Sequence, residues 1–304
     1  MSFSGDVKRE LATQTNGARH CQLAELSAII SFAGKMHIGD GDMHLRIETG
    51  NSMLKEKYRL LLSMLFAREE PEDGLTGEDA LRILESIKMW DAFRQCFCSM
   101  ETVDGLLIQQ NCCKRAFIRG AFLACGSMSN PGKSYHFEIV CATEEKAKQL
   151  QSIISTFHLE ARIVARKKYF VVYIKEGSQI VDILNVMEAP LALMELENIR
   201  ILKEMRGSVN RQVNCETANI NKTVSAALKQ MEDITRIKET IGFDSLPENL
   251  QEIARARLER PEATLKELGE SLNPPVGKSG VNHRLRKLST LAETLMEKGE
   301  VSEQ

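Results

Sequence analysis

Residues 279–295, SGVNHRLRKLSTLAETL, carry the side chains with the clearest chemistry in this sequence. If the segment is a helix, four polar side chains fall on one face: Ser279, Asn282, His283 and Arg286. Asparagine can form two hydrogen bonds with adenine and arginine two with guanine, while serine and histidine can bond to base edges or phosphates. These four residues are therefore candidates for reading base edges in duplex DNA.

Four basic residues flank this face at positions suited to backbone phosphates: Lys266, Lys278, Arg284 and Lys287. No acidic residue occurs between Pro274 and Thr290. Because the whole chain has a formal net charge of −2, attraction to DNA must come from a local patch of this kind rather than from the summed charge. The alternative interpretation is the ordinary solvated face of a three-helix domain.

Three helices should position this face. Pro247 can open the first as its initial residue, with Pro261 ending it, and ATLKELGESL predicts a short second helix. NPPVGKSG then precedes the last helix, for which Ser279 is the expected N-cap. Apolar residues at helical spacing predict its buried side: Val281, Leu285, Leu288, Ala292 and Leu295. This order predicts a helix-turn-helix motif at about residues 263–296, with a longer turn than the tight turn of that motif.

The N-terminal part shows the same succession of elements twice. One helix pattern ends at Gly34 and another at Gly126, and small residues in such helices allow their backbones to approach closely. A turn and an alternating strand follow each, DMHLRIET in the first copy and SYHFEIVCA in the second. Helices are then expected over Ser52–Phe66 and residues 144–157, the second capped by Thr143.

The second copy adds a hairpin, ARIVARKKYFVVYIKEG, and a closing helix from Ser178, whereas residues 70–78 of the first copy are polar and poor in strand formers. Two αββαββα units that meet along glycine-containing helices resemble the LAGLIDADG homing-endonuclease fold. In that family each motif helix supplies an acidic residue to the divalent metals that cleave DNA. The corresponding positions here are Ala33 and Cys125, which offer no carboxylate to Mg²⁺, so we expect no catalysis. Asp40 and Asp42 are expected to form a turn rather than to replace those ligands.

The strands of such a fold form a saddle over DNA, so their outward residues are a second candidate surface. Here Glu48 and Glu138 fall among the outward positions and would repel phosphate. We therefore expect a weak DNA surface or a protein-contact surface, with these basic residues: Arg46, Arg162, Arg166, Lys168, Lys175 and, farther along the chain, Arg206 and Arg211.

The eight cysteines lie mostly in apolar patterns, without a CxxC pair or a Cys/His ligand spacing. We therefore expect reduced, buried thiols, no metal site and no cofactor. No apolar run approaches the roughly 18–20 residues that span a bilayer, and the first residues lack the features of a signal peptide. A cytoplasmic, nucleoid-associated protein without a membrane partner is expected.

The predicted fold class is α+β. The expected divisions are an N-terminal helix at residues 1–20, a degenerate LAGLIDADG-like domain at 21–205, a linker with a connecting helix at 206–241, and an all-α helix-turn-helix domain at 242–304. The polar residues 210–221 are the expected boundary, and residues 223–241 are expected to form the connecting helix.

Across nearly the whole chain this combination closely resembles the WhiA family of Gram-positive bacterial regulators. The words VNCETANINKT, TLKELGESL and GKSGVNHRLRKL carry the resemblance most strongly. It implies a sigma-factor-like helix-turn-helix domain that binds double-stranded DNA, with roles in sporulation gene control in some members and in cell division and chromosome segregation in others. It also implies, in some members, a WhiB-type iron–sulfur regulator as partner. An unusual active endonuclease and a nucleoid protein with little sequence preference are the alternatives.

Overall fold

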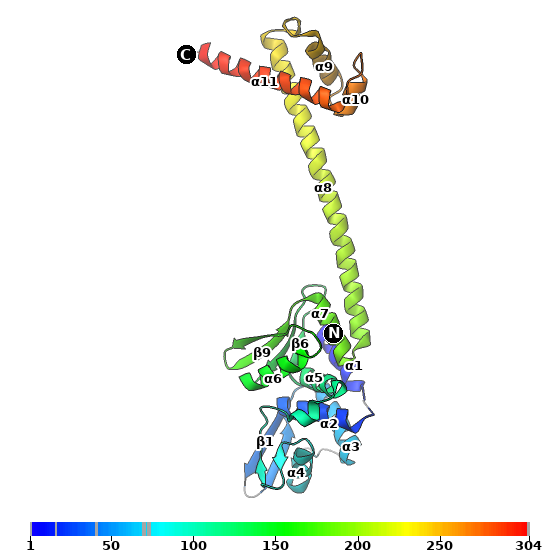
Figure 1. Cartoon of the computed structure of the whole chain (residues 1–304), viewed down its shortest axis with the longest axis vertical. Coiled ribbons are helices and arrows are strands. Elements are labelled where there is room, and N and C mark those ends of the chain that lie inside the picture. The colour runs from blue at the N-terminus through cyan, green and yellow to red at the C-terminus, as the bar shows by residue number, and fades with distance from the viewer. Residues whose placement is uncertain (1, 16, 40–41, 69–70, 72–73, 303–304) are drawn as a thin grey trace. The chain divides into compact units, whose positions relative to one another are not determined.

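The structure, a computed structural model, describes every residue except 1, 16, 40–41, 69–70, 72–73 and 303–304. The chain divides into two compact units, Met1–Glu204 and Met205–Gln304, and each is considered by itself (Figure 1).

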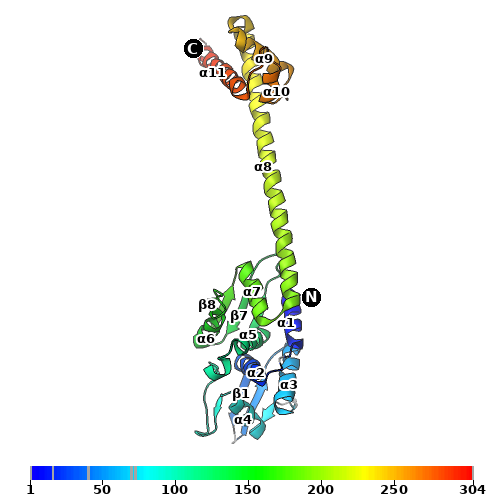
Figure 2. The same cartoon turned by 45° about the vertical axis from the view of Figure 1, so that its right-hand side comes forward.

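Two helices of equal length, α2 (Arg19–Ala33) and α5 (Asn111–Cys125), lie side by side in the middle of the first unit (Figures 1 and 2). At their contact a Cβ added to Gly120 would lie 2.6 Å from the carbonyl oxygen of Glu25, so only glycine allows this approach. The predicted close packing of two motif helices is confirmed.

The first repeat follows α2 with an antiparallel hairpin that a third, very short strand extends. Its elements are β1 (Gly34–Gly39), β2 (Asp42–Ile47), α3 (Ser52–Phe66), β3 (Leu75–Thr76) and α4 (Gly77–Ser86). The predicted bounds of α3 are confirmed, and the poor strand predicted near residues 70–78 contributes only β3. Asp40, in the predicted turn, lies outside the described residues. A small hairpin of β4 (Trp90–Asp91) and β5 (Cys96–Phe97) and a 3-10 turn (Gly105–Ile108) lead to α5.

The second repeat forms a four-stranded antiparallel sheet in the order β6-β7-β9-β8. Its elements are β6 (Gly126–Met128), β7 (Phe137–Cys141), α6 (Glu144–Ser155), β8 (Arg162–Arg166), β9 (Tyr169–Ile174) and α7 (Gly177–Met187). The Thr143 side chain accepts a hydrogen bond from the Lys146 amide and caps α6, as predicted. Helix α1 (Phe3–Thr13) also packs into this unit's core.

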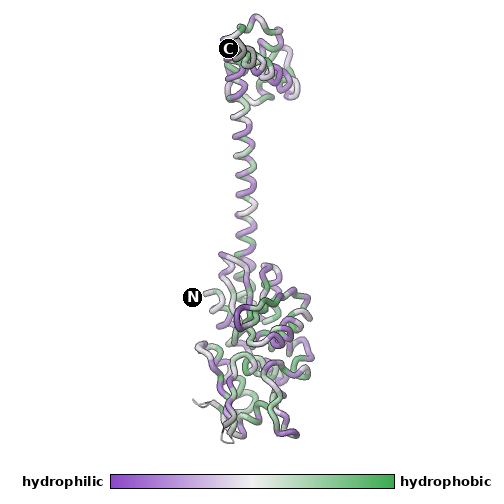
Figure 3. Tube along the Cα trace, turned by 90° about the vertical axis from the view of Figure 1, so that its left-hand side faces the viewer, coloured by the Kyte–Doolittle hydropathy of each residue, from purple (hydrophilic) through white to green (hydrophobic). Residues whose placement is uncertain are grey.

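Helix α8 covers Pro190–Thr240 without interruption, so residues 210–221, the predicted boundary, are helical and the predicted connecting helix begins well before residue 223. Those residues are exposed, but Asn and Thr each cost a helix less than about 1 kcal/mol, so a polar composition alone does not end one. Hydrophilic and hydrophobic residues are interspersed along α8 (Figure 3). Within the described part of the chain, no helix has the length and apolarity to cross a membrane.

In the second unit three helices pack on the last turns of α8: α9 (Glu248–Glu259), α10 (Leu265–Glu270) and α11 (Lys278–Ser302), after a 3-10 turn (Phe243–Ser245). Ile234 and Ile237 of α8 are fully buried in the shared core. Two predicted helix starts were wrong, by one residue for α9 and by two residues for α11. Pro247 is the N-cap of α9 rather than its first residue, and Ser279 lies inside α11 rather than capping it. The Gly277 carbonyl, which accepts the Val281 amide, stands at that end instead.

Candidate nucleic-acid interface and metal-ligating cluster

The two sides of α11 differ as the periodicity predicts. Its inner side is buried in the core of the second unit through Val281, Leu285, Leu288 and Ala292, with Leu295 half-buried. On the outer side the structure brings together the four predicted base-contact candidates: Ser279, His283 and Arg286 are exposed and Asn282 is half-buried. The helix thus presents a polar face on a firmly packed apolar back.

Helix α10 and the following turn hold α11 in place through a glycine. The Gly269 carbonyl accepts the Val276 amide at 2.9 Å, and a Cβ on Gly269 would lie 2.0 Å from the Val276 carbonyl oxygen. At the start of α10, Thr264 and Glu267 form a reciprocal capping box. The hydrogen bonds from Thr264 lower the pKa of the Glu267 carboxyl.

The four predicted phosphate contacts differ in their surroundings. Lys278 and Lys287 are exposed, and Lys266 is exposed with its ammonium 3.8 Å from Glu270. Arg284 is half-buried, with its guanidinium 3.9 Å from the Glu252 carboxylate and 3.4 Å from the Asn249 carbonyl oxygen. Arg284 therefore also ties α11 to α9, a role that the sequence analysis did not predict.

Acidic partners engage some of the basic residues on the outer strand faces. Arg46 pairs with Glu48 at 2.9 Å, and Arg166 lies 3.5 Å from Glu138, which also bonds to His136 at 2.9 Å. Burial alone would raise the pKa of Glu138, but its hydrogen bonds from His136 and Ser127 lower it. The remaining predicted basic residues are exposed: Arg162, Lys168, Lys175, Arg206 and Arg211.

The C-terminal ends of α2 and α5, where the sequence resemblance places the two replaced acids, lie in contact. The Cys125 thiol donates to the Phe32 carbonyl at 3.5 Å, next to Ala33. Lys146 donates to the Ser31 carbonyl at 2.5 Å, and its positive charge also acts on Cys125. Burial raises the pKa of the Cys125 thiol. These ends offer a cation a protonated thiol and a nearby ammonium, and in the described residues no group of three metal-ligating side chains lies there.

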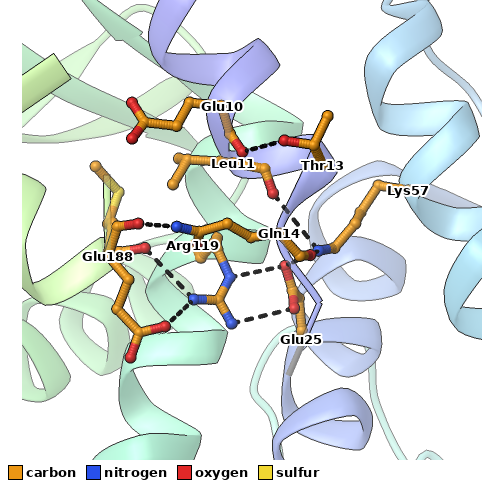
Figure 4. Close-up of polar contacts among 9 residues, drawn as sticks. Glu10, Leu11, Thr13, Gln14, Glu25, Lys57, Arg119 and Glu188 are labelled. Atoms are coloured by element: carbon orange, nitrogen blue, oxygen red, sulfur yellow. Dashed lines mark hydrogen bonds and ion pairs between the residues drawn. The ribbon is translucent and has the colours of Figure 1, made fainter. Parts of the chain in front are cut away.

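Instead, a buried ionic network crosses the middle of the helix pair (Figure 4). Glu25 of α2 accepts from Arg119 of α5 at 3.0 Å and lies 3.2 Å from the Lys57 ammonium of α3. Arg119 also pairs with Glu188 at 2.8 Å, and Lys57 donates to the carbonyl oxygens of Leu11 and Gln14.

Burial sets the electrostatics of this network. The side chains of Glu25, Lys57 and Arg119 are at most 2% exposed. Burial lowers the pKa of Lys57, and Glu25 offsets part of that shift. For Arg119 burial acts in the same direction, but the two carboxylates outweigh it and raise the pKa. The network thus joins four elements of the first unit through charges that depend on one another.

One cluster of cysteine and histidine side chains was not predicted from the sequence. His20, Cys21, Cys112 and Cys113 bring their ligand atoms within 4.8 Å of one another. Cys21, Cys113 and Cys141 are buried, as predicted, whereas the prediction of buried thiols was wrong for the exposed Cys96, Cys98 and Cys215. Burial and the neighbouring thiols raise the pKa of Cys21 to about 12, and burial also raises that of Cys113. A search for spacing within one segment cannot find this cluster, because its two halves belong to different repeats. Alignment of α2 with α5 could have found it, since both pairs are the second and third residues of their helices.

Models of known protein families match three segments of the chain. Family models match residues 19–70 as the WhiA N-terminal LAGLIDADG-like domain, 114–206 as the WhiA LAGLIDADG-like domain and 209–292 as the WhiA C-terminal HTH domain. Together with the paired α2 and α5 and the α9–α11 bundle, they define a protein with a LAGLIDADG-like part followed by a helix-turn-helix domain.

Two relatives resemble the chain over almost its full length. The "Probable cell division protein WhiA" of Lachnoclostridium phytofermentans is 50% identical over 311 residues, which cover 97% of this chain and 99% of that relative. The protein with the same name from Alkaliphilus oremlandii is 46% identical over 318 residues, with 98% of each covered. The chain belongs to the WhiA family, which confirms the resemblance seen in the sequence.

A solved structure supports the predicted fold. The crystal structure of full-length DUF199/WhiA from Thermatoga maritima has a TM-score of 0.58 and 26% identity, and the match covers 97% of this chain and 99% of that one. The α+β fold class with a LAGLIDADG-like N-terminal part is confirmed.

Proposed function

We propose that this WhiA-family protein binds double-stranded DNA sequence-selectively through the outer face of α11. The composition and exposure of this face are the main support for DNA binding. Ser279, His283 and Arg286 are exposed beside half-buried Asn282, in a stretch without acidic residues. Helices of this kind read the major groove when a packed apolar back fixes their orientation. Asn282 and Arg286 supply base discrimination, and Lys278 and Lys287 supply phosphate contacts.

In this proposal the first unit is a scaffold without nuclease activity. Ala33 and Cys125 stand where the nuclease acids would be, and Lys146 adds positive charge beside Cys125. Purified protein incubated with Mg²⁺ and its own DNA sites should leave the DNA intact. Magnesium-dependent cutting would restore the endonuclease alternative.

The strand faces are proposed as an auxiliary surface that contacts a protein partner or holds DNA weakly. The pairs Arg46–Glu48 and Arg166–Glu138 support a protein partner, because each pair reduces the positive charge available to phosphate. A WhiB-type regulator is the partner class that the family resemblance suggests.

The biological role that we propose is transcription regulation, cell division or both, in association with the nucleoid. The name of the two close relatives, probable cell division protein, supports the cell-division part.

Salt dependence tests sequence selectivity directly. Binding through phosphates alone falls steeply as salt rises, whereas base contacts persist. Affinity for a genomic target and for a scrambled duplex of equal length should therefore diverge as salt is increased. Parallel loss on both duplexes would favour a nucleoid protein with little sequence preference.

A further inference from the structure

We propose that His20, Cys21, Cys112 and Cys113 together bind one Zn²⁺ ion at the N-terminal ends of α2 and α5. The site is independent of the proposed DNA-binding face and has a structural role, joining the first repeat to the second.

The geometry of the four ligand atoms suits a tetrahedral ion. The His20 Nδ1 atom lies 3.2 Å from the Cys113 Sγ, 3.3 Å from the Cys21 Sγ and 4.0 Å from the Cys112 Sγ, and all four ligand atoms fall within 4.8 Å. With Zn–S bonds of about 2.3 Å and a Zn–N bond of about 2.0–2.1 Å, a tetrahedron places its ligand atoms about 3.6–3.8 Å apart. Small side-chain rotations therefore suffice to admit the ion.

The donor set selects the metal. Three thiolates and one imidazole form the Cys₃His combination that is common in closed, four-coordinate zinc sites. Soft sulfur donors disfavour Mg²⁺ and Ca²⁺, which require oxygen. Binding forms three Zn–S bonds and one Zn–N bond, and the three thiol protons pass to solvent.

The position of the cluster in the repeats gives a second, independent argument. His20 and Cys21 are the second and third residues of α2, and Cys112 and Cys113 are the second and third residues of α5. Each repeat thus contributes two ligands from equivalent positions, at the end of the helix pair opposite Ala33 and Cys125.

The surroundings protect the bonds yet leave a path for the ion. Cys21 and Cys113 are 1% and 4% exposed and pack with Ala24 and Ala116, whereas His20 is exposed. An ion can therefore enter from the His20 side, while the two buried thiolates remain shielded from solvent and oxidants.

Metal analysis of the full-length protein tests the proposal. Protein purified under reducing conditions and without chelator should contain one zinc per chain. The double variant C112S/C113S should lose that zinc. The matched control C96S/C98S changes two exposed cysteines of the same unit and should retain it.

Two further measurements remain decisive if the double variant folds poorly. Metal-free wild type titrated with Co²⁺ should develop thiolate-to-cobalt charge-transfer absorption and the d–d bands of tetrahedral Co²⁺, with saturation at one ion per chain. His20→Cys should keep zinc through four thiolates, whereas His20→Ala should bind it more weakly.

Three outcomes would overturn the proposal: reduced wild type that takes up neither zinc nor Co²⁺, loss of zinc in the control equal to that in C112S/C113S, or a disulfide within the cluster that persists under reducing conditions.

Discussion

Single side chains of α11 divide into those proposed to contact base edges and those proposed to contact phosphates. Arg286 is exposed on the face with Asn282 and His283, whereas Lys287 is a flanking cation. Arg286→Ala should reduce discrimination between a target and a mutated site by about 1–3 kcal/mol if the guanidinium makes two bonds to guanine. Lys287→Ala should weaken all duplexes alike and make the salt dependence shallower. Fluorescence anisotropy with both duplexes at several salt concentrations measures both effects, and equal losses in both variants would count against direct readout.

The buried network gives a prediction of stability. Glu25→Gln leaves Lys57 and Arg119 buried without their shared carboxylate, so unfolding should become easier by about 3–5 kcal/mol. The control is Asp6→Asn, which breaks the exposed pair with Arg9 and should cost less than about 1 kcal/mol. Urea unfolding followed by circular dichroism compares the two. Similar midpoints would mean that the network contributes little to the fold.

At the scale of elements, one close approach orients α11. Gly269→Ala would push a Cβ against the Val276 carbonyl oxygen, so the turn must shift and the second unit should lose about 1–3 kcal/mol or more. Gly277→Ala is the matched control, because an added Cβ there meets nothing within 4 Å. Thermal unfolding and DNA affinity should both fall in the first variant and stay near wild type in the second. An unchanged Gly269→Ala protein would show that the turn does not position α11.

Most of these elements were predictable because local periodicity and caps define them. The amphipathic spacing of α11, the Thr143 cap and the bounds of α3 follow from neighbouring residues. The continuity of α8 was not predictable from composition, because its polar residues 210–221 are compatible with both a helix and a linker. The Cys/His cluster and the Glu25 network depend on contacts between distant segments. Only the alignment of two repeats, or the fold itself, brings such residues together.

In the whole molecule, one chain contains both the LAGLIDADG-like part and the helix-turn-helix domain of the WhiA family. A truncation before α9 would expose Ile234 and Ile237, which are fully buried in the core of the second unit. Substitutions on the outer face of α11 are therefore the better way to ask which part recognises DNA, because they leave both hydrophobic cores intact.

The most direct test is genome-wide DNA capture with full-length wild type and with the triple variant N282A/H283A/R286A. A control variant, Thr290→Ala/Glu293→Ala, changes exposed α11 residues outside the proposed contact set. The account predicts discrete sites for wild type and control, and their loss in the triple variant while folding, checked by circular dichroism, is retained. Discrete sites that persist in the folded triple variant would contradict recognition by α11 and assign it to another part of the protein.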